Sequence, residues 1–180
     1  MSMLGAKRTM IVSVVMAGGQ GWRIWPLSTP RRPKQFCQLI GNKTLLQLTA
    51  DRMLSIPGQD NVLVVTLDEY VQKARRQLPD LPPECIISEP FPKNTGACVC
   101  LCALLLAEGF MGSTLDDIMV VCPSDHYVAD TVGFVETIMT AVEIASEKGK
   151  VATIGITPSR PETGYGYIKV CGDARATHNG

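Results

Sequence analysis

Continuous apolar runs alternate with helical patterns along the chain. The runs typical of strands are 11–17, 61–66, 84–88 and 116–122, followed by two more at 151–156 and 165–170. Helical patterns lie near 44–54, 68–78, 95–109 and 131–148. Strands that are apolar throughout, each followed by a helix, are typical of a mostly parallel sheet with helices on both faces. The pattern therefore predicts an α/β, Rossmann-like fold whose ligands bind beyond the carboxyl ends of the strands.

The predicted elements form one domain of ordinary size. Residues 1–10 precede the first strand and are interpreted as an N-terminal extension, and residues 11–180 as the domain itself. Lys7 and Arg8 followed by MIVSVVMA imitate a short signal peptide. This apolar run leads directly into a glycine-rich loop, so we interpret it as the first strand. The final letters, CGDARATHNG, follow a predicted strand without a closing helix, which predicts a domain truncated on its C-terminal side.

Charge and cysteine usage narrow the class of protein. The 17 basic and 17 acidic residues cancel, so no net field attracts nucleic acid or an anionic membrane. The apolar runs fall short of the roughly 18 residues of a membrane span. Seven cysteines without a C-x-x-C pair suit free thiols in a reducing cytoplasm. We therefore expect a cytoplasmic protein with neither nucleic acid nor membrane as a partner.

Three cysteines alternate in the apolar segment CVCLCALLLA, at Cys98, Cys100 and Cys102. Alternate residues of a helix point to different sides, so these thiols cannot converge on one metal ion. The segment is apolar on nearly every side. We expect a buried helix in which cysteine serves as a small packing group.

The segment GGQGWRIWPLSTPRRPKQ, residues 18–35, places glycines and cations directly after the first strand. Gly18, Gly19 and Gly21 allow backbone N–H groups to approach phosphate oxygens closely. Arg23 offers a planar fork for those oxygens, and Lys34 a compact second charge. A flexible surface turn is the alternative interpretation, but the linked features favour a phosphate-binding loop.

Two familiar phosphate loops do not fit this segment. The dinucleotide fingerprint G-x-G-x-x-G needs a glycine where Ile24 stands. A P-loop needs glycine followed by lysine and a hydroxyl residue, and that pattern is absent as well. The missing glycine argues against a Rossmann oxidoreductase.

Four segments together resemble the sugar-1-phosphate nucleotidyltransferases, and within them the mannose-1-phosphate guanylyltransferases. They are RIWPLSTPRRPKQF with LLQLTADRM, EPFPKNTGA at 89–97, PSDHYVAD at 123–130 and TIGITPSRPETGYGYIKV at 153–170. They occur in order and cover nearly the whole chain after the first ten residues. The resemblance implies a GT-A-like fold and transfer of GMP from GTP to α-D-mannose 1-phosphate, giving GDP-mannose and pyrophosphate. It also implies Mg²⁺ as cofactor.

The resemblance assigns roles to residues in each of these loops. It implies a nucleotide site made of Ala17, Gly18, Gly19, Gly21, Glu89, Asn94, Thr95 and Ser124. It implies catalytic roles for Arg23, Lys34 and Asp125, with Asp125 also a magnesium ligand. It implies sugar contacts from Glu162, Thr163, Gly164 and Gly166, for which an ordinary tight turn is the alternative.

Chemistry supports some of these assignments. Glu89 can accept two hydrogen bonds from the Watson–Crick edge of guanine. Asn94 and Thr95 suit the cap of the following helix. Asp125 lies at a strand's carboxyl end, where Mg²⁺ commonly takes one or two carboxylates plus phosphate oxygens, although a turn or helix cap is the alternative. A phosphate monoester is largely dianionic at neutral pH, with a second pKa of about 6, so no general base is needed. We therefore expect a structural role for His126.

The resemblance also places a second metal-binding aspartate and a lysine of a Val-Glu-Lys-Pro segment beyond Gly180. The activity of these 180 residues alone is therefore left open. Also open are the exact hexose, a homo-oligomer, a further isomerase or β-helix domain, and the role of Trp22. Two alternatives remain: a related nucleotidyltransferase with another base, and a catalytically silent subunit that binds a nucleotide sugar.

Overall fold

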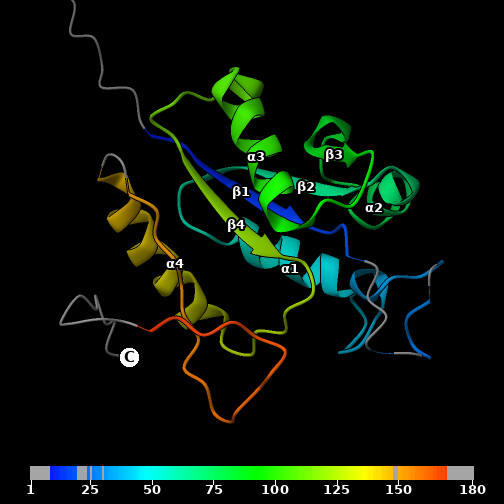
Figure 1. Ribbon diagram of the computed structural model, residues 1–180. Helices are drawn as coiled ribbons and strands as arrows, with labels where there is room; N and C mark the ends of the chain where they lie inside the picture. The colour runs from blue at the N-terminus through cyan, green and yellow to red at the C-terminus, as the bar shows by residue number, and fades with distance from the viewer. Residues whose placement is uncertain (1–8, 20–23, 25, 30, 148–149, 170–180) are drawn as a thin grey trace, which may run out of the picture. The chain divides into compact units, whose positions relative to one another are not determined.

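The computed structural model describes residues 9–19, 24, 26–29, 31–147 and 150–169 (Figure 1). The chain divides into two compact units, Met1–Ala129 and Asp130–Gly180. The first unit contains β1 (Ile11–Met16), α1 (Leu45–Leu54), β2 (Gln59–Leu67), α2 (Val71–Gln77), β3 (Ile86–Glu89), α3 (Asn94–Ala107) and β4 (Ile118–Pro123). Short 3-10 turns lie at Lys34–Phe36, Asp68–Tyr70, Pro83–Cys85 and Phe110–Gly112. The second unit contains α4 (Thr131–Ser146).

The strands of the first unit form a parallel sheet in the order β3-β2-β1-β4. The chain moves outward from β1 through β2 to β3, then returns to the other side of β1 for β4. Strand order therefore reverses at β1, and ligands of such sheets bind at the carboxyl ends of the strands beside that reversal. The α/β class predicted from the apolar runs is confirmed.

Helices cover both faces of the sheet, as predicted. Val14 of β1 and Leu63 and Val65 of β2 pack in one buried cluster with Cys102 and Leu106 of α3. Successive side chains of a strand point to opposite faces, so the neighbouring residues of β1 and β2 face away from α3. Helix α1 contacts β1 and β2, and it lies behind the sheet where α3 lies in front (Figure 1).

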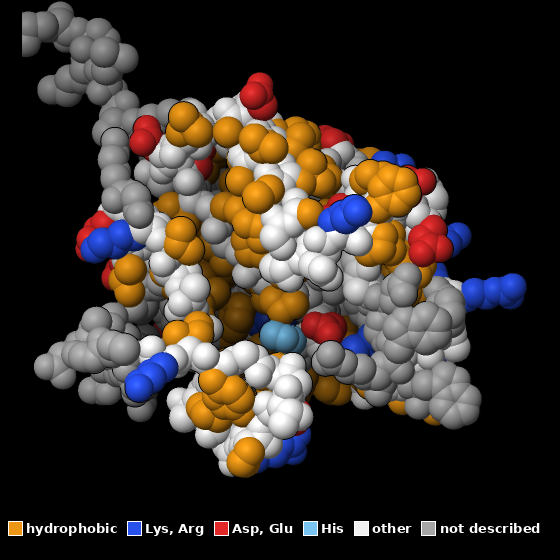
Figure 2. Space-filling model, in the orientation of Figure 1, with side chains coloured by type: hydrophobic (Ala, Val, Ile, Leu, Met, Phe, Trp, Pro, Cys, Tyr) orange, Lys and Arg blue, Asp and Glu red, His pale blue; other side chains and the backbone are white. Residues whose placement is uncertain are grey.

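The expectation that the cysteine-rich helix is a buried helix was wrong, because only one stripe of it is buried. Cys98, Cys102 and Leu106, four residues apart, form the buried stripe of α3. Cys100 and Leu104 lie on the other side, where Leu104 is 65% exposed. A helix that packs on one face of a sheet buries only the stripe that faces it, whatever the composition of its outer side. Figure 2 shows hydrophobic side chains gathered over this helix.

In the second unit, α4 begins at an aspartate cap: the Asp130 carboxylate accepts a hydrogen bond from the Gly133 N–H at 2.9 Å. The strands predicted at 151–156 and 165–170 are not found in the described residues 150–169. A strand is defined by hydrogen bonds to a neighbouring strand, and an apolar run does not by itself provide that neighbour. Val151 and Ile156 are accordingly 91% and 83% exposed.

None of the helices within the described ranges combines the length and the apolar character needed to cross a membrane.

Candidate active site

The carboxyl ends of the four parallel strands lie at one edge of the sheet. Met16, the last residue of β1, is in register with Pro123 of β4 on one side and with Val65 of β2 on the other. The Ser124 N–H donates to the Met16 carbonyl at 3.0 Å, so the segments that follow β1 and β4 lie side by side. On the far side of β2, Glu89 ends β3.

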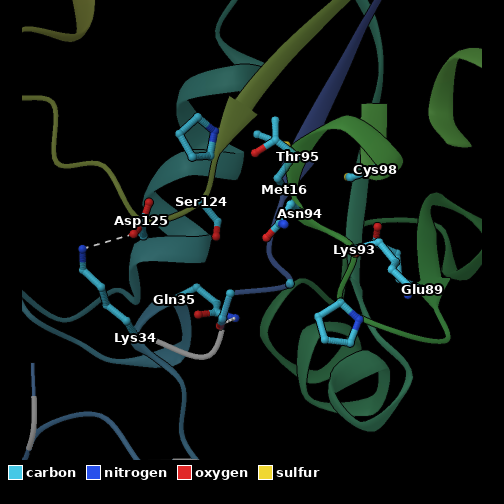
Figure 3. A pocket seen from close by; sticks show the side chains of 14 residues that line it. Met16, Lys34, Gln35, Glu89, Lys93, Asn94, Thr95, Cys98, Ser124 and Asp125 are labelled. Carbon is cyan, nitrogen blue, oxygen red and sulfur yellow. Dashed lines mark hydrogen bonds and ion pairs between the residues drawn. The ribbon is translucent and has the colours of Figure 1, made fainter. Parts of the chain in front are cut away.

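A cavity of about 580 Å³ lies at this edge (Figure 3). The residues that line it come from the loop after β1, the turn after Pro33, the segment from β3 to α3, and the end of β4. They are Met16, Gly18, Gly19, Lys34, Gln35, Glu89, Pro92, Lys93, Asn94, Thr95, Cys98, Pro123, Ser124 and Asp125.

Most site residues predicted in the first unit lie at this cavity. Its lining includes Gly18, Gly19, Lys34, Glu89, Asn94, Thr95, Ser124 and Asp125. Ala17 lies beside it, 1% exposed. The predicted Gly21 and Arg23, and also Trp22, fall outside the described residues. Their roles remain predictions.

The glycine loop is held by side chains that the sequence analysis did not select. The Ala17 carbonyl accepts from Gln35 Nε2 at 2.7 Å and from Thr66 Oγ1 at 2.9 Å. Gln35 Nε2 also donates to the Gly19 carbonyl at 3.0 Å. In the sequence, Gln35 is only the last residue of the segment 18–35, and its position along the chain does not reveal these contacts.

Glu89 stands at the cavity wall with its side chain mostly buried, and its carboxylate oxygens are not fully enclosed by the protein. The residue is 8% exposed, and burial raises the pKa of its carboxyl. Across the described part of the chain, no hydrogen bond or ion pair to this carboxylate is found. Its Oε2 lies where a side chain on Gly18 would project: a Cβ added there would be 3.1 Å away. A mostly buried carboxylate at a cavity wall is well placed to accept hydrogen bonds from a ligand.

The start of α3 differs from the predicted cap. Asn94 has a left-handed backbone, with φ of 64°, and Lys93 occupies the cap position without a capping hydrogen bond from its side chain. The expectation that Asn94 and Thr95 cap the helix was therefore wrong. Asparagine tolerates this conformation better than most residues. The turn brings Asn94 and Thr95 to the cavity, at a helix end that carries partial positive charge.

Opposite charges meet at the other side of the cavity. Lys34 Nζ lies 3.2 Å from Asp125 Oδ2, and both side chains are partly exposed (Figure 3). His126 Nε2 lies 3.9 Å from the other oxygen, Asp125 Oδ1. In the described ranges no cluster of three or more His, Cys, Asp or Glu side chains is suited to hold a metal ion. A single carboxylate fits Mg²⁺ only in company with ligand phosphates, which is the usual arrangement for this ion.

Helix α1 supports the segment that carries Asp125. Thr49 Oγ1 donates to the Ser124 carbonyl at 3.4 Å, and Arg52 Nη2 donates to the His126 carbonyl at 3.4 Å. Arg52 Nη2 also donates to Thr49 Oγ1 at 3.0 Å, and both side chains are buried. The backbone on either side of Asp125 is thus tied to α1. These contacts join residues more than 70 positions apart in the sequence, so no local sequence pattern predicts them.

The predicted sugar-binding residues lie in the second unit. There the Gly164 N–H donates to Glu162 Oε1 at 3.0 Å, and the Glu162 N–H donates to Tyr167 Oη at 2.8 Å. The segment is a turn closed by its own hydrogen bonds. Sugar contacts from Glu162, Thr163, Gly164 and Gly166 remain a prediction.

Comparisons with known proteins agree with this geometry. Residues 12–178 match the sequence pattern of the family described as nucleotidyl transferase. The alginate biosynthesis protein AlgA of Pseudomonas aeruginosa is 38% identical over 92% of this chain and 34% of its own length. The mannose-1-phosphate guanylyltransferase of Escherichia coli K12 is 40% identical over 90% of this chain and 34% of its own length.

A solved structure from Thermus thermophilus, described as a mannose-1-phosphate geranyltransferase, is similar with a TM-score of 0.62 and 32% identity. The match covers 77% of this chain and 39% of that one. The chain spans about a third of the length of the curated relatives it matches.

Proposed function

Since the chain belongs to the nucleotidyl transferase family, we propose that the protein transfers GMP from GTP to mannose 1-phosphate. An oxygen of the sugar phosphate attacks the α-phosphorus of GTP. The bond from that phosphorus to the bridging oxygen breaks, and pyrophosphate leaves with the electron pair. GDP-mannose is the other product. The relative named mannose-1-phosphate guanylyltransferase supports this choice of acceptor.

The observation that carries the proposal is the buried carboxylate of Glu89. An ionised carboxylate only accepts hydrogen bonds. Guanine presents two adjacent donors on its Watson–Crick edge, N1–H and the 2-amino group, and both can bond to such a group. Adenine presents an acceptor at N1 beside its 6-amino donor, which would leave a carboxylate oxygen facing a lone pair. Glu89 at the cavity wall therefore favours GTP over ATP.

The rest of the cavity suits the phosphates. Gly18 and Gly19 bring backbone to its edge, and Lys34 adds a positive charge. The amino end of α3 adds partial positive charge on the other side. Attack by a dianionic phosphate needs no proton removed, so the task of these groups is alignment and charge stabilisation. We assign no proton transfer to His126.

Asp125 is the residue that would hold a magnesium ion, together with phosphate oxygens of the substrates. The ion would supply positive charge against the charge that builds up on the transferred phosphoryl group. Lys34, whose Nζ lies 3.2 Å from Asp125 Oδ2, would act on the same phosphates. Thr49 and Arg52 of α1 hold the backbone on either side of Asp125 by hydrogen bonds to its neighbouring carbonyls.

The test follows pyrophosphate release by the full-length protein with Mg²⁺, mannose 1-phosphate and each of four nucleoside triphosphates. We expect release with GTP. Glu89→Gln should lower kcat/KM for GTP by roughly ten- to a hundredfold, because a hydrogen bond to a charged group contributes about 1.5–3 kcal/mol. Glu108→Gln, at an exposed glutamate outside the cavity, is the matched control and should behave like the wild type.

Asp125→Asn should reduce both Mn²⁺ binding and turnover. Its control is Asp51→Asn, because Asp51 forms a similar pair with Lys43, at 2.6 Å, on the surface of α1. A preference for another triphosphate would overturn the assignment of guanine to Glu89. Binding of GDP-mannose without pyrophosphate release would instead support a silent nucleotide-sugar subunit.

A further inference from the structure

Gln35 is a buried amide whose donors are both committed to the backbone of the glycine loop. The residue is 2% exposed and follows Lys34 in a single 3-10 turn. Its Nε2 group has two N–H donors, and it makes two hydrogen bonds, to the Ala17 carbonyl at 2.7 Å and to the Gly19 carbonyl at 3.0 Å. The two carbonyls belong to the residues on either side of Gly18.

The hydrogen bond to the Ala17 carbonyl constrains the direction of a backbone donor, and the bond to the Gly19 carbonyl holds the loop one residue after Gly18. In a trans peptide the carbonyl of Ala17 and the N–H of Gly18 lie in one plane and point in opposite directions. A carbonyl held toward Gln35 therefore turns the Gly18 N–H away from Gln35. Thr66 Oγ1, at 2.9 Å from the same Ala17 oxygen, reinforces this orientation. Glycine has many alternative conformations, so without such ties the loop would lose entropy when it ordered around a ligand.

We propose that Gln35 is a positioning residue of the phosphate site: its amide holds the carbonyls of Ala17 and Gly19, and through the peptide that joins Ala17 to Gly18 it keeps the Gly18 N–H ready for a nucleotide phosphate. The inference rests on the proposed function, because it concerns the same nucleotide. It assigns Gln35 an action through the loop, not through contact with the base. Lys34 and Gln35 are neighbours in one 3-10 turn and have different roles: Lys34 provides a positive charge, and Gln35 fixes the backbone of the glycine loop.

The test separates the phosphate part of binding from the base part. Gln35→Met keeps the length of the side chain and removes both donors. We expect it to weaken binding of GTP at least tenfold and binding of guanosine less than twofold, measured by calorimetry and by ligand-observed NMR. Gln38→Met is the matched control: Gln38 lies three residues on, and its Nε2 donates to the Asn42 carbonyl at 2.9 Å on the surface. This control should bind both ligands like the wild type.

A second pair of variants keeps the test decisive if Gln35→Met does not fold. Thr66→Val removes only the additional hydrogen bond to Ala17, and Thr66→Ser retains the hydroxyl. We expect Thr66→Val to weaken GTP binding severalfold, again with little effect on guanosine binding. We expect Thr66→Ser to bind GTP like the wild type. Equal losses for GTP and guanosine, or unchanged GTP binding in both Gln35→Met and Thr66→Val, would overturn the proposal.

Failure of the proposed function can be told apart from failure of this inference. If the wild type prefers another triphosphate, the guanine assignment fails. The comparison is then made with that triphosphate and its nucleoside, and a selective loss with the triphosphate still supports the role of Gln35. A wild type that binds no nucleotide would overturn both.

Discussion

Replacing Gly18 with alanine tests whether the glycine loop packs against the Glu89 carboxylate that we propose binds guanine. The new methyl carbon would lie 3.1 Å from Glu89 Oε2, whereas the same change at Gly19 meets nothing within 4 Å. Neither glycine has a positive φ, so the backbone accepts alanine at both positions. The two variants therefore differ mainly in their effect on Glu89.

The size of the effect follows from this geometry. Ordinary contact begins near 3.4 Å, so the Glu89 carboxylate must move by a few tenths of an ångström. Because the residue is 8% exposed and lines the cavity, the movement is directed toward the cavity, which takes the carboxylate away from its position for the base. A charge-assisted hydrogen bond contributes about 1.5–3 kcal/mol, and a displaced pair should lose a fraction of that. We expect Gly18→Ala to lose about 1–2 kcal/mol of GTP binding, or roughly five- to thirtyfold in affinity.

The assay compares GTP with inosine triphosphate, which keeps N1–H but lacks the 2-amino group. Gly18→Ala should reduce the preference for GTP over inosine triphosphate, and Gly19→Ala should leave it unchanged. Glu89→Gln removes the charge-assisted hydrogen bonds to the base. In that background Gly18→Ala should reduce the affinity for GTP clearly less than in the wild type, because the effects of mutations at residues in contact are not additive. Equal losses in the two alanine variants, or additive losses with Glu89→Gln, would refute the reasoning.

Three further outcomes follow from the structure. Burial raises the pKa of the Glu89 carboxyl, so the folded protein binds the proton of this carboxyl more tightly than the unfolded chain does. The free energy of unfolding therefore falls as pH rises from the ordinary glutamate pKa of about 4.3 through the raised pKa of the folded state. Glu89→Gln should remove that fall and melt higher than the wild type at pH 7 in thermal unfolding. Thr49→Val should lower the free energy of unfolding by about 1–3 kcal/mol in urea titrations, since it leaves a buried Arg52 donor without its hydroxyl acceptor, and Thr49→Ser should not. Iodoacetamide should label Cys100 before Cys98 and Cys102 in the native protein, as read by mass spectrometry, and equal labelling would mean that the outer side of α3 is covered.

The order of elements and the edge of the sheet that bears the site followed from the sequence by itself. Apolar runs that alternate with helical periods are local signals, and they predicted β1 to β4 with small errors at their ends. Parallel strands bring their carboxyl ends to one edge, so the loops after them could be read as one site before any contact was known. This reasoning, together with the roles that the family resemblance implies, brought Gly18, Lys34, Glu89 and Asp125 together, and these residues line one cavity.

Only the tertiary structure decided which side chains hold that site in place and which surfaces are buried. Gln35 reaches Ala17 across 18 positions and Arg52 reaches His126 across 74, distances over which sequence periodicity carries no information. The outer side of α3 is apolar yet exposed, because burial depends on what packs against a helix and not on its composition. Residues 151–156 have the apolar character of a strand, but a strand also needs a hydrogen-bonded neighbour, and a neighbour is a property of the fold.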